Sequence, residues 1–188
     1  SQFTIHYYFK NKDTLNGYLT NLQQNIKTGG FFIGTCYDGL KIFNELEKPE
    51  PFEYVDDLGK LIYRVEKKYK IKDFEYKGEE KDMLGQEINV FMESIGQNIP
   101  EYLVNFDYFV DIMDKYGFEP YKPKMKPKYN KVIEKDIGSF LDIIKELETI
   151  QKEDDDLKRR YKSSLDILKN PALMKLSSMN NYFIFQKK

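Results

Sequence analysis

The most restrictive feature of this sequence is a short apolar run, Phe31-Phe32-Ile33-Gly34-Thr35, that directly follows an amphipathic segment. Runs of this length and composition are typical of strands that are buried on both faces of a sheet. The segment before the run has apolar residues at steps of four, three and four, as on one face of a helix: Leu15, Leu19, Leu22 and Ile26. Gly29 and Gly30 then end the helix in the way that glycine commonly does.

Two flanking segments extend this order of a helix followed by a strand. Residues 2–9 are aromatic and β-branched, which predicts a strand. Residues 40–47 predict a second helix, which Pro49 ends. Strand, helix, strand and helix in this order favour an α/β layer with a parallel sheet.

The rest of the chain predicts further elements. Strands are expected within residues 63–76, at Glu87–Met92 and at Asn181–Phe185. Helices are expected from Pro100-Glu101 to Gly117, from Ile137 to Leu147 and from Asp154 to Leu168.

Composition narrows the possible chemistry. A chain of 188 residues fits one domain or a large part of one. Its 30 basic and 31 acidic residues nearly cancel, so any contact with nucleic acid is expected to be local. The single cysteine, Cys36, and the single histidine, His6, exclude a disulfide framework and make a protein metal cage an unexpected feature. No apolar run reaches about 18 residues, so no membrane span is predicted.

Cys36 and His6 also permit another hypothesis, a thiol nucleophile with its base. The alternative interpretation is a small residue at a strand end and an imidazole near a turn, and we favour it. These general patterns therefore predict an α/β domain without a specific reaction.

Four segments carry a more specific signal, because they occur in a fixed order over nearly the whole chain. They are Gln2-Phe3-Thr4-Ile5-His6-Tyr7, Gly29-Gly30-Phe31-Phe32-Ile33-Gly34-Thr35, Pro100-Glu101-Tyr102-Leu103-Val104 and Tyr182-Phe183-Ile184-Phe185. Together they resemble the mRNA cap guanine-N7 methyltransferases, and among these the capping enzymes of large DNA viruses. The residues after Gly34-Thr35 depart from the family pattern, which often has a second threonine and a proline there.

The resemblance implies a fold class: α/β, the C-terminal half of a Rossmann-like seven-stranded class I methyltransferase sheet. Residues 1–188 would be the cap-binding portion of the domain, and residues 52–96 an insertion on its cap side. In this family a glycine-rich turn that binds S-adenosylmethionine precedes the first of the four segments. We therefore expect the main donor site in a missing N-terminal half, and no activity from this chain alone.

The resemblance also implies roles for individual residues. Glu101 would accept hydrogen bonds from guanine N1–H and the exocyclic amine, His6 would donate to O6, Tyr7 would form a wall of the pocket, and Tyr182 would lie near the base. Residues that would approach S-adenosylmethionine are Gln2, Phe3 and Thr4. Guanine N7 has a free lone pair, so no general base is needed, and Glu101 would stabilise the charge that develops on the ring.

Each role has a structural alternative. Glu101 could stand in the first turn of a helix, where the dipole favours negative charge. His6 could be an ordinary core histidine, and Tyr182 an ordinary strand aromatic. Four lysines in an extended segment could meet RNA phosphates or simply protect an exposed edge: Lys122, Lys124, Lys126 and Lys128.

The predicted function is methyl transfer from S-adenosylmethionine to N7 of the RNA cap guanine. The alternative is a non-catalytic cap-binding, RNA-binding or stimulatory module on a degenerate methyltransferase fold. Expected partners are the capped RNA 5′ end, the missing half of the domain and other capping-enzyme domains or a stimulatory subunit. The expected location is intracellular, in a viral factory, virion or nucleus.

Overall fold

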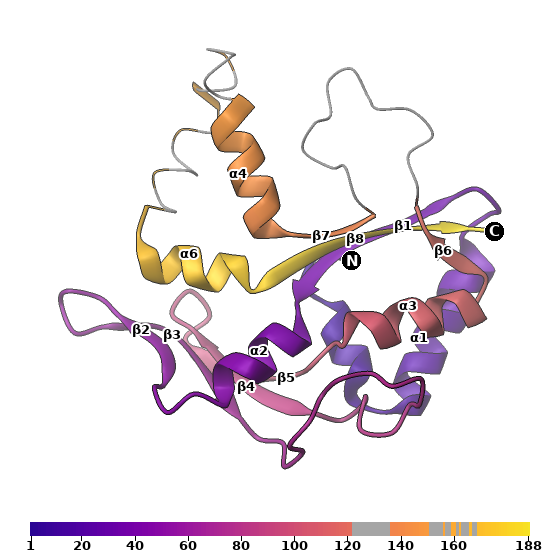
Figure 1. Ribbon diagram of the computed structural model, residues 1–188, viewed down its shortest axis with the longest axis horizontal. Coiled ribbons are helices and arrows are strands. Elements are labelled where there is room, and N and C mark those ends of the chain that lie inside the picture. The colour runs from indigo at the N-terminus through magenta and orange to yellow at the C-terminus, as the bar shows by residue number, and fades with distance from the viewer. Residues whose placement is uncertain (122–135, 151–155, 157–158, 161, 163–165, 167–168) are drawn as a thin grey trace.

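The computed structural model describes residues 1–121, 136–150, 156, 159–160, 162, 166 and 169–188. In these residues the chain forms two small sheets with helices packed around them, a mixed α/β fold (Figure 1). None of the described helices is long and apolar enough to cross a membrane.

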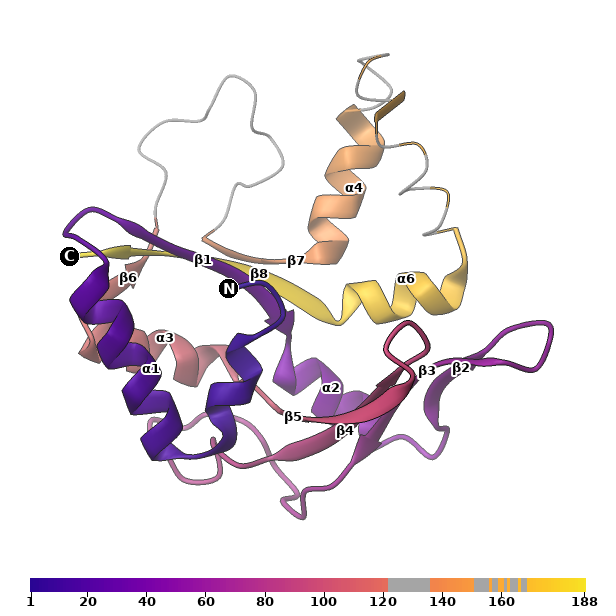
Figure 2. The ribbon, with the colours of Figure 1, turned by 180° about the vertical axis from the view of Figure 1, so that it is seen from behind.

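The first sheet is built around the C-terminal strand β8 (Asn180–Lys187). β1 (Phe31–Tyr37) pairs with one edge of β8, and β6 (Phe118–Pro120) and β7 (Ile137–Ser139) pair with it as well. Helices α1 (Lys12–Asn25) and α3 (Phe106–Lys115) lie on one side of this sheet, and α4 (Phe140–Ile150) rises on the other (Figures 1 and 2).

The expected parallel sheet is wrong for the strand ladders that the structure describes. β8 is antiparallel to each of its three partners, and the described parallel contact is a single bridge between Gln2 and Thr35. The physical reason is that the C-terminal strand inserts between β1 and β6. Because both are antiparallel to β8, β1 and β6 run parallel to each other without pairing.

The second sheet is an antiparallel meander of four strands: β2 (Phe52–Val55), β3 (Leu61–Lys67), β4 (Glu87–Met92) and β5 (Gln97–Tyr102). Residues 52–96, expected as an insertion, supply three of these strands, and β5 completes the sheet. Helix α2 (Gly39–Leu46) leads from β1 toward this sheet. Helix α6 (Pro171–Ser178) leads into the start of β8 and contacts the second sheet, where the Tyr63 hydroxyl donates to Ala172 O (Figure 2).

The N-terminal strand predicted at residues 2–9 is wrong beyond its first residues. Only residues 1–3 run along β1, with Phe3 N–H donating to Thr35 O at 2.8 Å. Residues Ile5–Lys10 form the 3₁₀ helix η1, which buries Ile5, His6 and Phe9. Burying residues one turn apart outweighs the strand propensity of the aromatic side chains, which depends on packing more than on the backbone.

The helix predicted from Pro100-Glu101 is also wrong at its start. Both residues belong to β5, whose register pairs Pro100 with Asn89 and Glu101 with Ile88. β5 is the last strand of its sheet, and proline is tolerated on such an edge. Helix α3 instead begins at Phe106, because the Asn105 side chain accepts hydrogen bonds from two backbone N–H groups of its first turn. Glu101 is therefore not at a helix N-terminus.

Several other predictions are confirmed within a few residues: the helices at 12–25 and 39–46 and the strands at 31–37, 87–92 and 180–187. Ile137, expected in a helix, begins the short strand β7, and the helix starts at Phe140. The helix α6 was not predicted. The helix expected at 154–168 lies largely outside the described residues.

One aromatic cluster joins η1 to the first sheet. The buried Phe109 of α3 contacts the rings of Phe9, Phe183 and Phe185, with centroids 5.7, 5.1 and 5.1 Å away. These rings favour such edge-on contacts. The cluster fixes η1 beneath β8, and η1 in turn places His6 and Tyr7.

Candidate substrate site

A cavity of about 360 Å³ lies where η1 meets both sheets. Its volume falls in the range of roughly 300–1,000 Å³ that is usual for small-molecule sites. The lining residues come from η1, β1, β4, β5, α4, α6, β8 and the segments beside them: Phe3, His6, Tyr7, Tyr37, Val90, Met92, Ile95, Glu101, Phe140, Leu176, Ser177 and Asn180. We call this space the Glu101 cavity.

Local structure explains how three of the predicted residues reach this cavity. Ile5 and Phe9 anchor η1 in the core, so that His6 lies buried beside the cavity and Tyr7 stays 40% exposed at its rim. The His6 and Tyr7 rings meet at an interplanar angle of 65°, with centroids 4.2 Å apart. Glu101 reaches the same space from β5, and it is only 9% exposed.

His6 and Glu101 therefore meet although they are far apart in the sequence. His6 Nε2 lies 3.6 Å from Glu101 Oε2, which is too far for a good hydrogen bond. Both His6 ring nitrogens and Glu101 Oε2 are buried without a hydrogen-bond partner in the described part of the chain. The site thus holds polar atoms that a ligand could satisfy.

Burial moves the pKa of each group toward its neutral form. It lowers the pKa of His6 from 6.5 to about 4, and raises the pKa of Glu101 from 4.5 to about 7. Between these values both side chains are neutral, so the 3.6 Å contact is not an ion pair in the free protein. Burial, and then the Glu101 charge, also raise the pKa values of Tyr7 and Tyr37.

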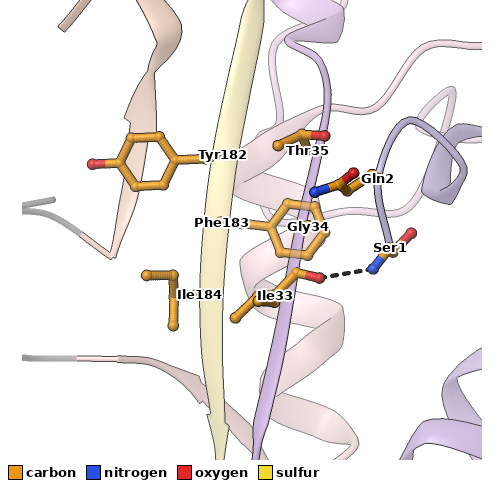
Figure 3. Close-up of a pocket in the computed structure, with 8 residues that line it drawn as sticks. All are labelled: Ser1, Gln2, Ile33, Gly34, Thr35, Tyr182, Phe183 and Ile184. Atoms are coloured by element: carbon orange, nitrogen blue, oxygen red, sulfur yellow. Dashed lines mark hydrogen bonds between the residues drawn. The ribbon is translucent and has the colours of Figure 1, made fainter. Parts of the chain in front are cut away.

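A second cavity of about 340 Å³ lies over β1 and β8, beside the N-terminal residues. Figure 3 shows Ser1 and Gln2 along β1, with the Ser1 nitrogen donating to Ile33 O at 2.8 Å. Phe183 points toward Gly34, where an added Cβ would come within 2.3 Å of the ring. Tyr182 points the other way, toward β7.

The predicted residues are thus divided between two cavities. His6, Tyr7, Glu101 and Phe3 line the Glu101 cavity, whereas Gln2 and Tyr182 line the second one. The Thr4 hydroxyl is 2.7 Å from that of Ser1. The lysines at 122, 124, 126 and 128 lie outside the described residues.

Phe3 has an unusual conformation for a large side chain. Its φ is +50°, in the left-handed region that costs a residue with a side chain of order 1–3 kcal/mol. Its ring is nevertheless 49% exposed, and it touches Phe140 edge-on. An exposed, strained aromatic at the Glu101 cavity is a feature often found at ligand sites.

The alternative thiol chemistry has no support in the structure. Cys36 is fully buried in the core, and burial raises the pKa of its thiol well above the ordinary value. A protonated, inaccessible thiol is a poor nucleophile. Among the described residues, no group of three His, Cys, Asp or Glu side chains could hold a metal ion.

The sequence did not reveal several cavity residues, and Asn180 is the most notable of them. Asn180 pairs with Tyr37 across the β1–β8 ladder, and both line the Glu101 cavity. In the sequence it lies just before the strand predicted at Asn181–Phe185, and that position gave no chemical signal. Its only hint was that it lies two residues before Tyr182 and hence on the same face of a strand.

The fold and the cavity together define a class of protein: a mixed α/β domain with a cavity lined by residues whose buried polar atoms lack partners in the described structure. The comparisons give the family. The chain belongs to the mRNA (guanine-N(7))-methyltransferase domain family, whose profile matches residues 1–170. The matched residues include the Glu101, His6 and Tyr7 segments and stop before β8, so Asn180 and Tyr182 lie beyond them.

Individual relatives agree with the family. An mRNA cap guanine-N(7) methyltransferase of Saccharomyces cerevisiae is 32% identical over 123 residues, covering 63% of this chain and 27% of the yeast protein. That of Eremothecium gossypii is 27% identical over 144 residues, covering 75% of this chain and 32% of its own length. A probable mRNA-capping enzyme of Acanthamoeba polyphaga mimivirus is 28% identical over 207 residues, covering 99% of this chain.

The chain is much shorter than these relatives. It spans 32% and 27% of the two fungal proteins and 17% of the mimivirus protein. The similarity therefore concerns one portion of each relative. In the viral protein, that portion matches 99% of this chain.

Proposed function

We propose that this chain is the cap-binding portion of an mRNA cap guanine-N7 methyltransferase, which transfers a methyl group from S-adenosylmethionine to N7 of the cap guanine. Membership of the family supports the reaction class. The observation that carries the proposal is the meeting of Glu101 and His6, with unpartnered polar atoms in the described structure, at one cavity of suitable size.

The two side chains complement the edges of guanine. Guanine offers N–H donors at N1 and at its exocyclic amine, and an acceptor at O6. An ionised Glu101 accepts from the donors, and a neutral His6 has one ring N–H that donates to O6. Adenine reverses this pattern, so it would leave the buried carboxylate unsatisfied, which is a strong basis for discrimination.

The residues of the Glu101 cavity also suit methyl transfer to N7. N7 needs no deprotonation, so holding the base in place and excluding water supply most of the catalysis. Methylation puts positive charge on the ring, and the nearby Glu101 carboxylate stabilises that charge in a buried, weakly screened site. Tyr7 and Phe3 provide aromatic surface at the rim, where 40% and 49% of each residue is exposed.

S-adenosylmethionine supplies the methyl group when it is bound. The described residues fit only part of such a ligand. Phe3 presents exposed aromatic surface, and the buried Thr35 hydroxyl has no hydrogen-bond partner among the described residues. Gln2 lines the second cavity beside Thr35, and the Thr4 hydroxyl lies close by. We assign Gln2, Phe3 and Thr4 to the donor side, and the main donor site to a preceding half of the domain.

The fold supports the assignment of this chain to the later, cap-binding half of the domain. In the first sheet β1 and β6 share one direction and β8 opposes both, as expected for the later strands of a Rossmann-like sheet that ends with an antiparallel strand. Residues 52–96, with β5, form a separate sheet that closes the cavity from the other side. We assign this sheet to the cap side of the domain. The expected partners are capped RNA and the rest of the domain.

The test uses the full-length protein that contains this chain. We expect Glu101→Gln to lower kcat/KM for methylation of capped RNA by at least about tenfold, because a charge-assisted pair of hydrogen bonds is lost. Glu66→Gln is the matched control, since Glu66 lies on β3, is partly exposed and pairs with Lys68 at 3.2 Å. Equal activity of the Glu101→Gln protein would remove Glu101 from the guanine site, and cap binding without any methyl transfer in the parent protein would favour the non-catalytic alternative.

A further inference from the structure

One lining residue of the Glu101 cavity has a polar atom that the guanine contacts above do not use. Asn180 is the first residue of β8 and is 6% exposed. Its Oδ1 is buried without a hydrogen-bond partner in the described residues, as are Glu101 Oε2 and the His6 ring nitrogens. Four unpartnered polar atoms thus belong to three residues that line the same cavity.

The orientation of the Asn180 amide is fixed by its surroundings. Its Nδ2 donates to Leu176 O at 3.1 Å and to Ser177 O at 3.4 Å, at the C-terminal end of α6. Two carbonyl oxygens require the NH₂ group on their side, so the amide oxygen must lie on the other. Leu176, Ser177 and Asn180 all line the cavity, so the last turn of α6 fixes the Asn180 amide beside it.

An acceptor at this place meets an unfilled requirement of guanine. The Watson–Crick edge carries three hydrogens, one at N1 and two on the exocyclic amine. Glu101 has two oxygens and takes the N1 hydrogen and one amine hydrogen, which leaves the second amine hydrogen without a partner. Leaving such a donor unsatisfied in a buried site is costly.

We propose that Asn180 is a specificity-determining residue, whose side-chain oxygen accepts the second hydrogen of the guanine 2-amino group. The inference rests on the proposed function and deepens it. Asn180 selects for the 2-amino group, whereas Glu101 reads N1–H as well. Inosine, which has N1–H and O6 but no 2-amino group, therefore separates the two contributions.

The experiment measures the affinity of the full-length protein for a guanosine cap dinucleotide and for the matching inosine cap dinucleotide. We expect the parent protein to prefer the guanosine cap, and Asn180→Ala to lower that preference by about tenfold through weaker guanosine binding. Affinity for the inosine cap should be unchanged. Because both ligands report on the same folded fraction, partial unfolding does not alter the ratio.

Two further variants secure the comparison. Asn181→Ala is the matched control: Asn181 is 7% exposed, bonds to Asp38 and Lys41, and does not line the cavity. It should keep the preference. Asn180→Ser is measured in parallel, because its hydroxyl can still donate to the α6 carbonyls if alanine prevents folding.

The outcomes separate the two ideas. An unchanged guanosine preference in Asn180→Ala and Asn180→Ser overturns the role of Asn180 and leaves the proposed function intact. Failure of the parent protein to bind the guanosine cap overturns the proposed function and this inference together.

Discussion

At the scale of single residues, Glu101 combines two opposing demands. Burial favours its neutral acid and raises its pKa to about 7, whereas the proposed guanine recognition needs the carboxylate. Satisfying the carboxylate with N–H donors would offset the cost of its burial. Ligand binding and ionisation of Glu101 are therefore coupled.

This coupling predicts a pH dependence of cap affinity. With a pKa of about 7, roughly one tenth of Glu101 is ionised at pH 6 and roughly nine tenths at pH 8, so affinity should rise about tenfold over this range. His6 stays neutral throughout, because its pKa is about 4. The pKa values of the facing Tyr7, Tyr37 and Cys36 are all raised, away from this range.

Titration calorimetry with a cap dinucleotide between pH 6 and pH 8 measures this dependence. Glu101→Gln should bind more weakly and with a flat profile. A rising profile in that variant would show that another group is responsible.

The same carboxyl predicts a gain of stability when it is replaced. Its folded-state pKa lies above the unfolded value of 4.5, so the folded state binds more protons between pH 4.5 and 7, and Glu101's contribution to stability is lost as pH rises through about 7. The Glu101→Gln protein has no carboxyl group at this position, so its stability does not fall in this way as pH rises. We expect its free energy of unfolding to exceed the parent's by about 3 kcal/mol at pH 8, because the folded and unfolded pKa values of Glu101 differ by about 2.5.

Urea unfolding of the free parent and Glu101→Gln proteins at two pH values checks the sign of this stability difference. At pH 4 the parent carboxyl is mostly protonated in both the folded and the unfolded state, and the two proteins should differ little. The opposite shift of His6, from 6.5 to about 4, is common to both proteins and cancels. Equal stabilities at pH 8 would contradict the raised pKa.

At the scale of elements, a close backbone contact joins the start of α2 to Val104, which follows β5 and lies three residues after Glu101. Gly39 starts α2, and its N–H donates to Val104 O at 2.9 Å. A Cβ at Gly39 would lie 2.6–2.7 Å from three backbone atoms of Val104. Backbone atoms cannot move aside as a flexible side chain can, so this approach requires glycine.

We therefore expect Gly39→Ala to lower the free energy of unfolding by about 2 kcal/mol or more and to weaken cap binding. Gly17→Ala is the matched control in the exposed middle of α1, where nothing lies within 4 Å. It should raise stability by about 0.5–1 kcal/mol. Denaturant unfolding of both variants tests these opposite signs, and a loss in both would point to a general intolerance of alanine.

The elements also show where sequence patterns suffice. The helix at 12–25 and the strands at 31–37 and 87–92 could be predicted, because their hydrophobic periods follow local geometry. The 3₁₀ helix η1 could not, since it depends on burying Ile5 and Phe9 in the core, where Phe9 packs against Phe109 of α3. Strand β5 could not be predicted either, because Pro100-Glu101 is compatible with a helix start and with an edge strand. Only the position of the segment at the edge of a sheet distinguishes the two.

At the scale of the whole molecule, the Glu101 cavity draws its walls from both sheets. His6 comes from η1, Glu101 from the second sheet and Asn180 from the first. A ligand that contacts all three residues ties the two sheets together, and it stabilises the folded state by mass action.

We expect a guanosine cap dinucleotide at about 100 times its Kd to raise the free energy of unfolding by about 2.7 kcal/mol. Amide hydrogen exchange should slow in η1, β5 and the start of β8 together. The turn between β2 and β3, where Leu58 is 93% exposed, serves as the internal control and should be unchanged. Protection confined to one sheet would contradict binding between the two.

The sequence by itself determined the family and the candidate residues Glu101, His6 and Tyr7, because ordered motifs are properties of the chain. It also determined the elements whose hydrophobic period is local. Only the tertiary structure decided that His6 and Glu101 lie 3.6 Å apart, that Tyr182 faces a second cavity and that Asn180 lines the first. The physical reason is that burial and the pairing of polar atoms arise from packing between distant segments, which no local pattern encodes.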